Sequence, residues 1–166
     1  MEASKFLLIA LVLTICAVVF QLIGLASPYW ILVDSTTMKT NAGLWKSCTE
    51  TFQYGITVCM DTEEDWLKAV RAMSILASLV LVVAAIMAVL KLFVLKDMKP
   101  ILFVGIGTAF AGAVFILISI AVYSAKLNDL YANLDFNYHF AFAFSIMGMI
   151  AAIGGGVVML VEIMKG

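Results

Sequence analysis

The chain has 166 residues, of which 64% are hydrophobic and only 13% are charged, and its mean hydropathy is +1.12. Soluble domains usually have about half of their residues apolar and about a quarter charged, so this composition excludes an ordinary soluble domain. The net charge of −1 excludes a polybasic surface for nucleic acid.

Four apolar stretches are long enough to cross a membrane, because a spanning helix needs about 20 predominantly apolar residues. We expect spans over residues 6–27, 67–95, 101–123 and 139–161. The third span is expected to continue outward as a helix, since Leu127, Leu130, Tyr131 and Leu134 recur at helical spacing. The sequence therefore predicts a single four-span membrane domain over residues 1–166.

Two spans have features with more than one interpretation. The small residues Gly24-Leu25-Ala26 suit a signal-peptide cleavage site, but the apolar core before them exceeds the roughly 7–15 residues of such a peptide, which favours a retained helix. In the fourth span, Gly148, Ala152 and Gly156 recur every four residues. This stripe predicts close helix packing within the bundle, with a dimer contact as the alternative.

The lysines near the span ends indicate the orientation in the membrane. Five of them lie on the side that also holds both termini: Lys5, Lys91, Lys96, Lys99 and Lys165. Because Lys and Arg prefer the cytoplasmic side, we expect both termini, the loop 96–100 and the tail 162–166 to be cytoplasmic. The loops 28–66 and 124–138 are then extracellular.

Two of the three cysteines, Cys48 and Cys59, lie in the first extracellular loop, and Cys16 lies in the first span. A cysteine pair in a short extracellular loop predicts a disulfide, which would stabilise the fold by about 3 kcal/mol in the chain-entropy model. The absence of a CxxC motif and of a nearby histidine argues against a zinc or redox site. Cys16 is expected to be a small apolar residue.

The first extracellular loop is predicted to form a small antiparallel sheet. Residues 29–33, 44–45 and 56–58 are rich in aromatic and β-branched residues, and Tyr54-Gly55 suits a turn. The end of the loop is predicted to start a helix above the bilayer. Asp61 with Glu64, or Thr62 with Asp65, fits a capping box, and Glu64 with Lys68 forms an i,i+4 ion pair.

The order of several loop residues supports a family resemblance. The chain has Trp30, then Gly43-Leu44-Trp45-Lys46-Ser47-Cys48, then Cys59, and Arg71 at the entrance of the second span. In this order it resembles the superfamily of claudins, peripheral myelin protein, epithelial membrane proteins and lens fibre tetraspans. The resemblance implies a left-handed four-helix transmembrane bundle with a small extracellular antiparallel β-sheet. It also implies that the disulfide joins neighbouring strands and that Trp30 and the Gly43-Leu44-Trp45 turn seat the sheet on the helices.

Other features leave the branch of the superfamily open. Junction-forming claudins usually end in a hydrophobic motif that PDZ domains recognise, whereas residues 161–166 contain no such motif. The glycosylated myelin branch has an Asn-x-Ser/Thr sequon, and this chain has none. The segment 66–71 is closer to the myelin, epithelial and lens members.

The resemblance implies a structural role at the plasma membrane, at contacts between cells. The protein would form adhesive contacts or a paracellular barrier by self-association within one membrane (in cis) and across two membranes (in trans). Apolar loop residues that become buried on contact are the candidates: Met38, Phe52, Tyr54, Tyr131, Leu134 and Phe136. The alternative for these residues is a membrane-interface belt or packing against the sheet.

Carboxylates outnumber lysines in the first extracellular loop, which favours cations near its surface. The candidates for charge selectivity are Asp61, Glu63, Glu64 and Asp65. Capping and complementing the dipole of the following helix is the alternative role of this group.

The sequence also bears on functions other than adhesion. An auxiliary subunit of a channel or receptor, or a membrane-organising tetraspan of the myelin or lens type, needs only lipid-facing and loop surfaces. A pore is disfavoured because polar residues in the spans are scarce. An enzyme is not expected, since His139 is the only histidine and the spans contain no carboxylate. We expect no cofactor and no metal.

Overall fold

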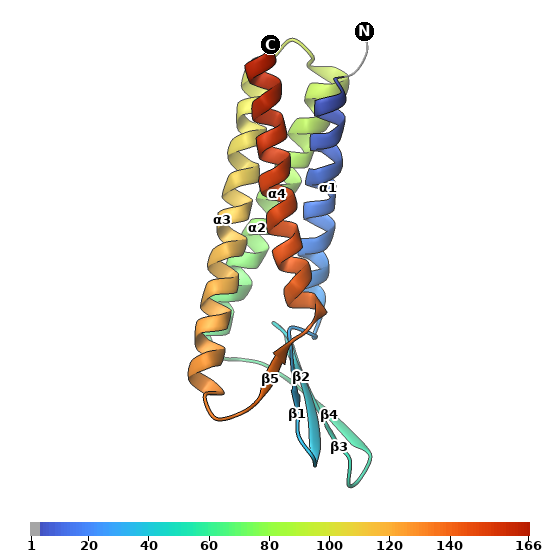
Figure 1. The fold of residues 1–166 in the computed structure, drawn as a ribbon, viewed down its shortest axis with the longest axis vertical. Coiled ribbons are helices and arrows are strands. Elements are labelled where there is room, and N and C mark those ends of the chain that lie inside the picture. The colour runs from blue at the N-terminus through green and yellow to red at the C-terminus, as the bar shows by residue number, and fades with distance from the viewer. Residues whose placement is uncertain (1–3) are drawn as a thin grey trace.

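Four long helices pack side by side, and a β-sheet projects from one end of the bundle (Figure 1). This computed structural model describes residues 4–166. The helices are α1 (Lys5–Ala26), α2 (Asp65–Val89), α3 (Lys99–Leu130) and α4 (Phe140–Lys165). The strands are β1 (Ile31–Asp34), β2 (Met38–Ala42), β3 (Lys46–Thr51), β4 (Ile56–Asp61) and β5 (Phe136–Tyr138). The four-helix bundle and the antiparallel sheet confirm the expected fold.

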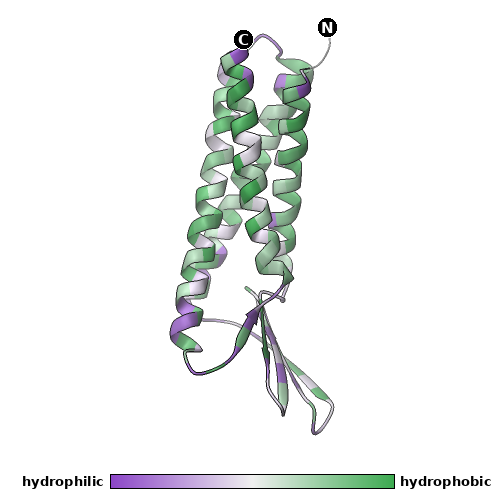
Figure 2. Ribbon diagram, in the orientation of Figure 1, coloured by the Kyte–Doolittle hydropathy of each residue, from purple (hydrophilic) through white to green (hydrophobic). Residues whose placement is uncertain are grey.

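All four helices are long and apolar enough to cross a membrane. A short π-helix, η1 (Leu90–Val94), continues α2 at the end of the bundle opposite the sheet. Figure 2 shows hydrophobic residues along the helices, whereas hydrophilic ones gather at the helix ends and in the sheet. At 1.5 Å per residue, α3 is about 48 Å long, so it extends beyond a hydrocarbon layer of about 30 Å. Pro100 lies in its first turn, where a missing N–H costs little.

Small residues let the helices approach closely. A Cβ atom on Gly148 would lie 3.3 Å from the Ala17 carbonyl oxygen, so α4 and α1 are in backbone contact there. A Cβ atom on Gly112 of α3 would lie only 2.6 Å from Leu81 of α2. Because Gly148, Ala152 and Gly156 are buried in the isolated chain, the predicted stripe packs within the bundle.

Hydroxyl groups inside the bundle bond to one another and to helix carbonyls. The Ser74 and Ser119 hydroxyls are 2.7 Å apart, and Ser78 donates to the Ser74 carbonyl oxygen at 2.9 Å. Gln21 of α1 donates to the same carbonyl oxygen at 3.5 Å. The Gln21 and Ser74–Ser119 hydrogen bonds link α1, α2 and α3, whereas the Ser78 bond lies within α2.

The five strands form one antiparallel sheet in the order β4-β3-β2-β1-β5. Strand β5 comes from the loop between α3 and α4 and pairs with β1, with Ile31 opposite Tyr138. The predicted turn at Gly55 is confirmed by its left-handed φ of 60°. The predicted strand over Leu44 and Trp45 is wrong, because these residues form the turn between β2 and β3.

The sheet has one apolar and one polar face, since successive side chains of a strand point to opposite sides. The strand register places on the mainly apolar face Ile31, Val33, Met38, Thr40, Ala42, Ile56, Val58, Met60, Phe136 and Tyr138, together with Ser47, Thr49 and Thr51 of β3. The polar face carries Asp34, Lys39, Lys46, Glu50, Asp61 and both loop cysteines. Near the bundle, the apolar face packs against the helix ends through Ile31, Val33 and Ala42.

Candidate functional site

Trp30 anchors the start of the sheet in the bundle. Its side chain is 0% exposed, and its indole N–H donates to the Gly24 carbonyl oxygen at 2.6 Å. Its ring lies 4.7 Å from that of Tyr123 and 5.7 Å from that of Phe142, between centroids. A single side chain from the loop therefore contacts α1, α3 and α4, so the position of β1 is tied to three helices.

Gly43 and Leu44 form the turn that rests on the end of α1. A Cβ atom on Gly43 would lie 2.5 Å from the Pro28 Cα and 2.6 Å from the Ser27 carbonyl oxygen, so only glycine fits. Leu44 is completely buried in the same cluster as Trp30. The close approach of two backbones explains why this turn needs glycine before its apolar residue.

Arg71 joins this turn to the segment that enters α2. Its Nε donates to the Leu44 carbonyl oxygen at 2.6 Å, and its Nη2 donates to the Thr62 hydroxyl at 2.9 Å and to the Thr62 carbonyl oxygen. The guanidinium also lies 4.9 Å from the centre of the Trp45 ring. One side chain of α2 therefore fixes both ends of the β3–β4 hairpin.

Trp45 is placed differently from Trp30. Its ring is 41% exposed, while its indole N–H donates to the Leu25 carbonyl oxygen at 2.8 Å. The ring therefore lies on the outside of the bundle, near the last turn of α1. Tryptophan is enriched at this level of membrane proteins because its ring is apolar and its N–H is polar.

The predicted capping box at the start of α2 is wrong. Glu64 precedes the helix, but its side chain makes no capping hydrogen bond. The Thr62 hydroxyl donates to the Leu44 carbonyl oxygen at 3.2 Å and accepts from Arg71. Lys68 pairs with Asp65 at 2.9 Å and not with Glu64. The Thr62 hydroxyl thus bonds to the Leu44 turn and to Arg71 instead of capping α2. The spacing of residues near the helix start does not reveal these partners.

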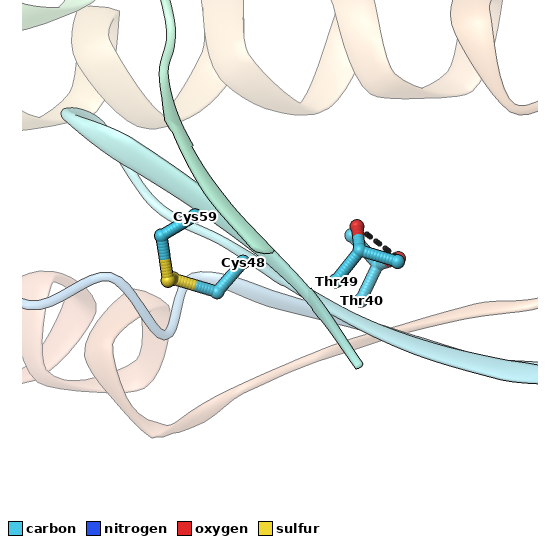
Figure 3. The surroundings of a disulfide bond; sticks show 4 residues. All are labelled: Thr40, Cys48, Thr49 and Cys59. Atoms are coloured by element: carbon cyan, nitrogen blue, oxygen red, sulfur yellow. Dashed lines mark hydrogen bonds between the residues drawn. A yellow bond between two sulfur atoms is a disulfide. The ribbon is translucent and has the colours of Figure 1, made fainter. Parts of the chain in front are cut away.

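The predicted disulfide is confirmed. Cys48 and Cys59 lie directly opposite each other on β3 and β4, with Cα atoms 4.0 Å apart, and their sulfur atoms are bonded. Such close facing pairs occur at positions of an antiparallel ladder that lack mutual hydrogen bonds. Figure 3 shows this bond and the neighbouring Thr40–Thr49 pair, whose hydroxyls are 3.0 Å apart.

The candidate contact residues fall into two groups. Met38, Phe52, Tyr54 and Leu134 are exposed in the isolated chain. Tyr131 and Phe136 are half-buried against the cluster around Trp30, with ring centres 6.0 Å apart. The first group is free to contact another molecule, whereas the second also stabilises the junction between sheet and bundle.

Strand β4 is a free edge of the sheet, and its apolar residues were not among the candidates. Ile56, Val58 and Met60 alternate with Thr57 and Cys59, and all three are more than half exposed. The alternation was visible in the sequence, but which strand lies at the edge depends on the pairing order. We define the outer patch as Met38, Ile56, Val58 and Met60, which share one face of the sheet, with the β3 side chains of that face, Thr51 among them, between Met38 and β4.

The four candidate carboxylates follow one another around the entry to α2. Asp61 ends β4, Glu63 and Glu64 lie in the link, and Asp65 begins the helix. All four are exposed, and Asp65 is paired with Lys68. Within residues 4–166, no group of three or more His, Cys, Asp or Glu side chains is arranged to hold a metal ion.

Comparison with known proteins agrees with this geometry. The model of the PMP-22/EMP/MP20/Claudin family matches residues 3–160. The chain therefore belongs to this family of non-enzymatic, four-span integral membrane proteins. No curated protein sequence matches the chain closely enough to add a named relative.

Proposed function

We propose that this protein mediates cell–cell contact or forms a paracellular barrier by self-association in cis and in trans. The outer patch is the observation that supports this proposal most strongly. It places three apolar side chains on the edge strand β4, with Val58 53% exposed, and Met38 on the same face of β2. An exposed edge with apolar residues promotes pairing with another chain.

The loop tips extend the same surface. Phe52 and Tyr54 lie in the turn between β3 and β4 and are strongly exposed, at the end of the sheet farthest from the helices (Figure 1). Leu134 is exposed in the loop that precedes β5. A neighbouring copy would bury these side chains, which is favourable by about 25 cal/mol per Å² of apolar surface.

The proposed orientation places the sheet outside the cell and both termini in the cytoplasm, with the protein in the plasma membrane. A disulfide within the sheet supports this, because disulfides persist on the oxidising side of the membrane. The lysines at the opposite end of the bundle, among them Lys91, Lys96 and Lys99, agree with the cytoplasmic preference for positive charge.

We further propose that a barrier built from these sheets favours cations. Asp61, Glu63 and Glu64 are exposed, and none of the ion pairs found in residues 4–166 involves them. Their charge therefore acts on the solvent next to the sheet. Fields of one sign raise the local concentration of the opposite ions.

An auxiliary subunit of a channel or receptor is the second candidate, and a groove in the bundle favours it. The groove, of about 300 Å³, lies between α1 and α2 and is lined by aliphatic side chains that include Ile15, Val19, Val82 and Ile86. In a bilayer this surface would meet lipid or the transmembrane helix of a partner. A membrane-organising role of the myelin or lens type would use the same surface.

Expression of a fluorescent form in non-adherent cells tests the first proposal. Its density at contacts between two expressing cells is compared with its density at contacts where only one cell expresses it. Enrichment restricted to contacts between two expressing cells is the predicted result. A uniform distribution would contradict trans self-association, and capture of a channel or receptor from detergent extracts would then support the auxiliary role.

A further inference from the structure

A cavity of about 380 Å³ opens between the sheet and the sheet-end turns of α2 and α3. Ligand pockets are typically about 300–1,000 Å³, so this volume suits a small group. Its lining combines four kinds of side chain: the aliphatic Ile31 and Leu67, the aromatic Trp66, Tyr123 and Tyr131, the hydroxyl-bearing Ser47 and Thr62, and the carboxylate of Glu64.

The three aromatic residues come from α2, from α3 and from the position directly after α3, and each ring packs against another aromatic ring. Trp66 lies in the first turn of α2, and its ring centre is 5.9 Å from that of Tyr123, at an angle of 54°. Tyr123 is 2% exposed and packs on Trp30. Tyr131 directly follows the last residue of α3 and packs against Phe136. Tyr123 is therefore a buried support, and the partly exposed rings of Trp66 and Tyr131 are the ones that can meet a cation, which the negative potential of aromatic faces attracts.

The charge of the cavity is also suited to a cation. Glu64 is the only charged residue in its lining, and no lysine or arginine lines it. The Glu64 side chain makes no capping bond to α2, so its carboxylate is available to a ligand. An anion would meet this carboxylate without compensation, whereas a cation would be attracted by both the carboxylate and the rings.

The level of the cavity identifies the class of ligand. Tyr123 lies at the end of the apolar run of α3, and Leu127 and Leu130, which also line the cavity, continue along the same side of the helix. With a hydrocarbon layer of about 30 Å and headgroup layers beyond it, these turns lie among the lipid headgroups. In the orientation proposed above, they are the headgroups of the outer leaflet.

We propose that this cavity binds the trimethylammonium group of a choline phospholipid from the outer leaflet. The methyl groups contact the rings of Trp66 and Tyr131 and the aliphatic wall, and Glu64 balances the charge. A primary ammonium is strongly hydrated and needs several hydrogen-bond acceptors, whereas this lining offers the Glu64 carboxylate and a few hydroxyl groups beside a mainly apolar wall. Lys126 lies between Tyr123 and Leu130 on the flank of α3, where it can pair with the lipid phosphate.

Reconstitution with lipids of identical acyl chains tests the proposal. The purified full-length protein is placed in mixed micelles that contain phosphatidylcholine, phosphatidylethanolamine or phosphatidylglycerol, and the retained lipid is measured by native mass spectrometry. Preferential retention of phosphatidylcholine is expected. Equal retention of all three lipids would overturn the proposal, because it would reflect only the solvation of the helices by acyl chains.

Variants separate the cavity from the general lipid surface. Glu64→Gln and Tyr131→Leu are each expected to reduce phosphatidylcholine retention by about three- to tenfold, the range that a cation–π or paired-charge contact supports. Glu63→Gln, which removes a neighbouring carboxylate outside the cavity, is expected to change nothing. Equal losses in Glu63→Gln and Glu64→Gln would contradict the assignment.

Free choline distinguishes the source of the headgroup. If excess choline chloride leaves the bound phosphatidylcholine in place, the acyl chains contribute to binding, as the position at the membrane predicts. Displacement of the lipid with retention of choline alone would assign the cavity to a free cation and overturn the lipid proposal. The inference does not use self-association, so the two proposals can fail independently.

Discussion

Gly43 lies where the β2–β3 turn crosses the backbone at Ser27 and Pro28. Replacing it with alanine would put a methyl group 2.5 Å from a backbone atom that cannot move aside by changing rotamer. Overpacking of this kind typically costs about 1–3 kcal/mol. We expect Gly43→Ala to lower the melting temperature of the purified protein in detergent.

Gly107→Ala is the matched control for Gly43→Ala. No atom lies within 4 Å of the position that a Cβ atom on Gly107 would occupy in α3. Alanine is favoured over glycine in a helix by up to about 1 kcal/mol, so this variant is expected to be unchanged or slightly more stable. If both variants melted at the wild-type temperature, the close contact of the turn with Pro28 would be contradicted.

Arg71 makes contacts that a lysine cannot reproduce, because its planar group donates to Leu44 and Thr62 at the same time. We expect Arg71→Lys to lower the free energy of unfolding by about 1–3 kcal/mol. The variant should therefore reach the cell surface in smaller amounts. Lys68→Gln removes only an exposed ion pair, which is worth about 0–1 kcal/mol. Surface biotinylation compares the two, and equal delivery would show that the charge of Arg71 suffices.

At the level of single elements, the β3–β4 hairpin depends on its disulfide, because β4 has a neighbour on one side only. Removing a native disulfide from a small extracellular domain typically costs about 2–5 kcal/mol. We expect Cys48→Ser and Cys59→Ser to be retained inside the cell, and the double variant to be no worse than either single one. Cys16→Ser, outside the sheet, is the control, and normal surface delivery of both single variants would contradict the prediction.

The helices and the hairpin could be predicted from sequence, whereas the edges of the sheet could not. Apolar runs define helices locally, and two cysteines in one short loop define a disulfide. Strand β5 has only three residues, which are too few to show the alternation of apolar and polar residues typical of a strand. It forms because it pairs with β1, about a hundred residues earlier in the chain. The identity of β4 as a free edge follows from that same pairing order.

The hydrogen-bond acceptors of the Arg71 and Trp30 side chains could not be predicted from the sequence either. Both side chains donate to backbone carbonyl oxygens, at Leu44 and Gly24 respectively, and a carbonyl oxygen has no residue-type signal. The family resemblance identified these positions, but the structure supplies the physical reason. Likewise, Tyr131 and Phe136 look like free loop aromatics until their packing on the sheet–bundle junction is seen.

At the scale of the whole molecule, the acidic link between sheet and bundle is expected to influence ion passage. In epithelial monolayers that express the protein, we expect the double variant with Asp61→Asn and Glu63→Gln to reduce the preference for sodium over chloride. Neither residue is in a salt bridge found in the described chain, so folding should be unaffected. Unchanged dilution potentials would exclude this group from charge selectivity.

The outer patch connects the fold to the proposed function, and contact between two expressing cells tests it most directly. Val58 lies on the apolar face of β4, whereas Thr57, its neighbour on the strand, lies on the opposite face. In the mixed-cell assay, we predict that Val58→Asp abolishes enrichment at contacts while Thr57→Asp preserves it, with both variants at the cell surface. Undiminished enrichment of Val58→Asp would contradict self-association through the outer patch.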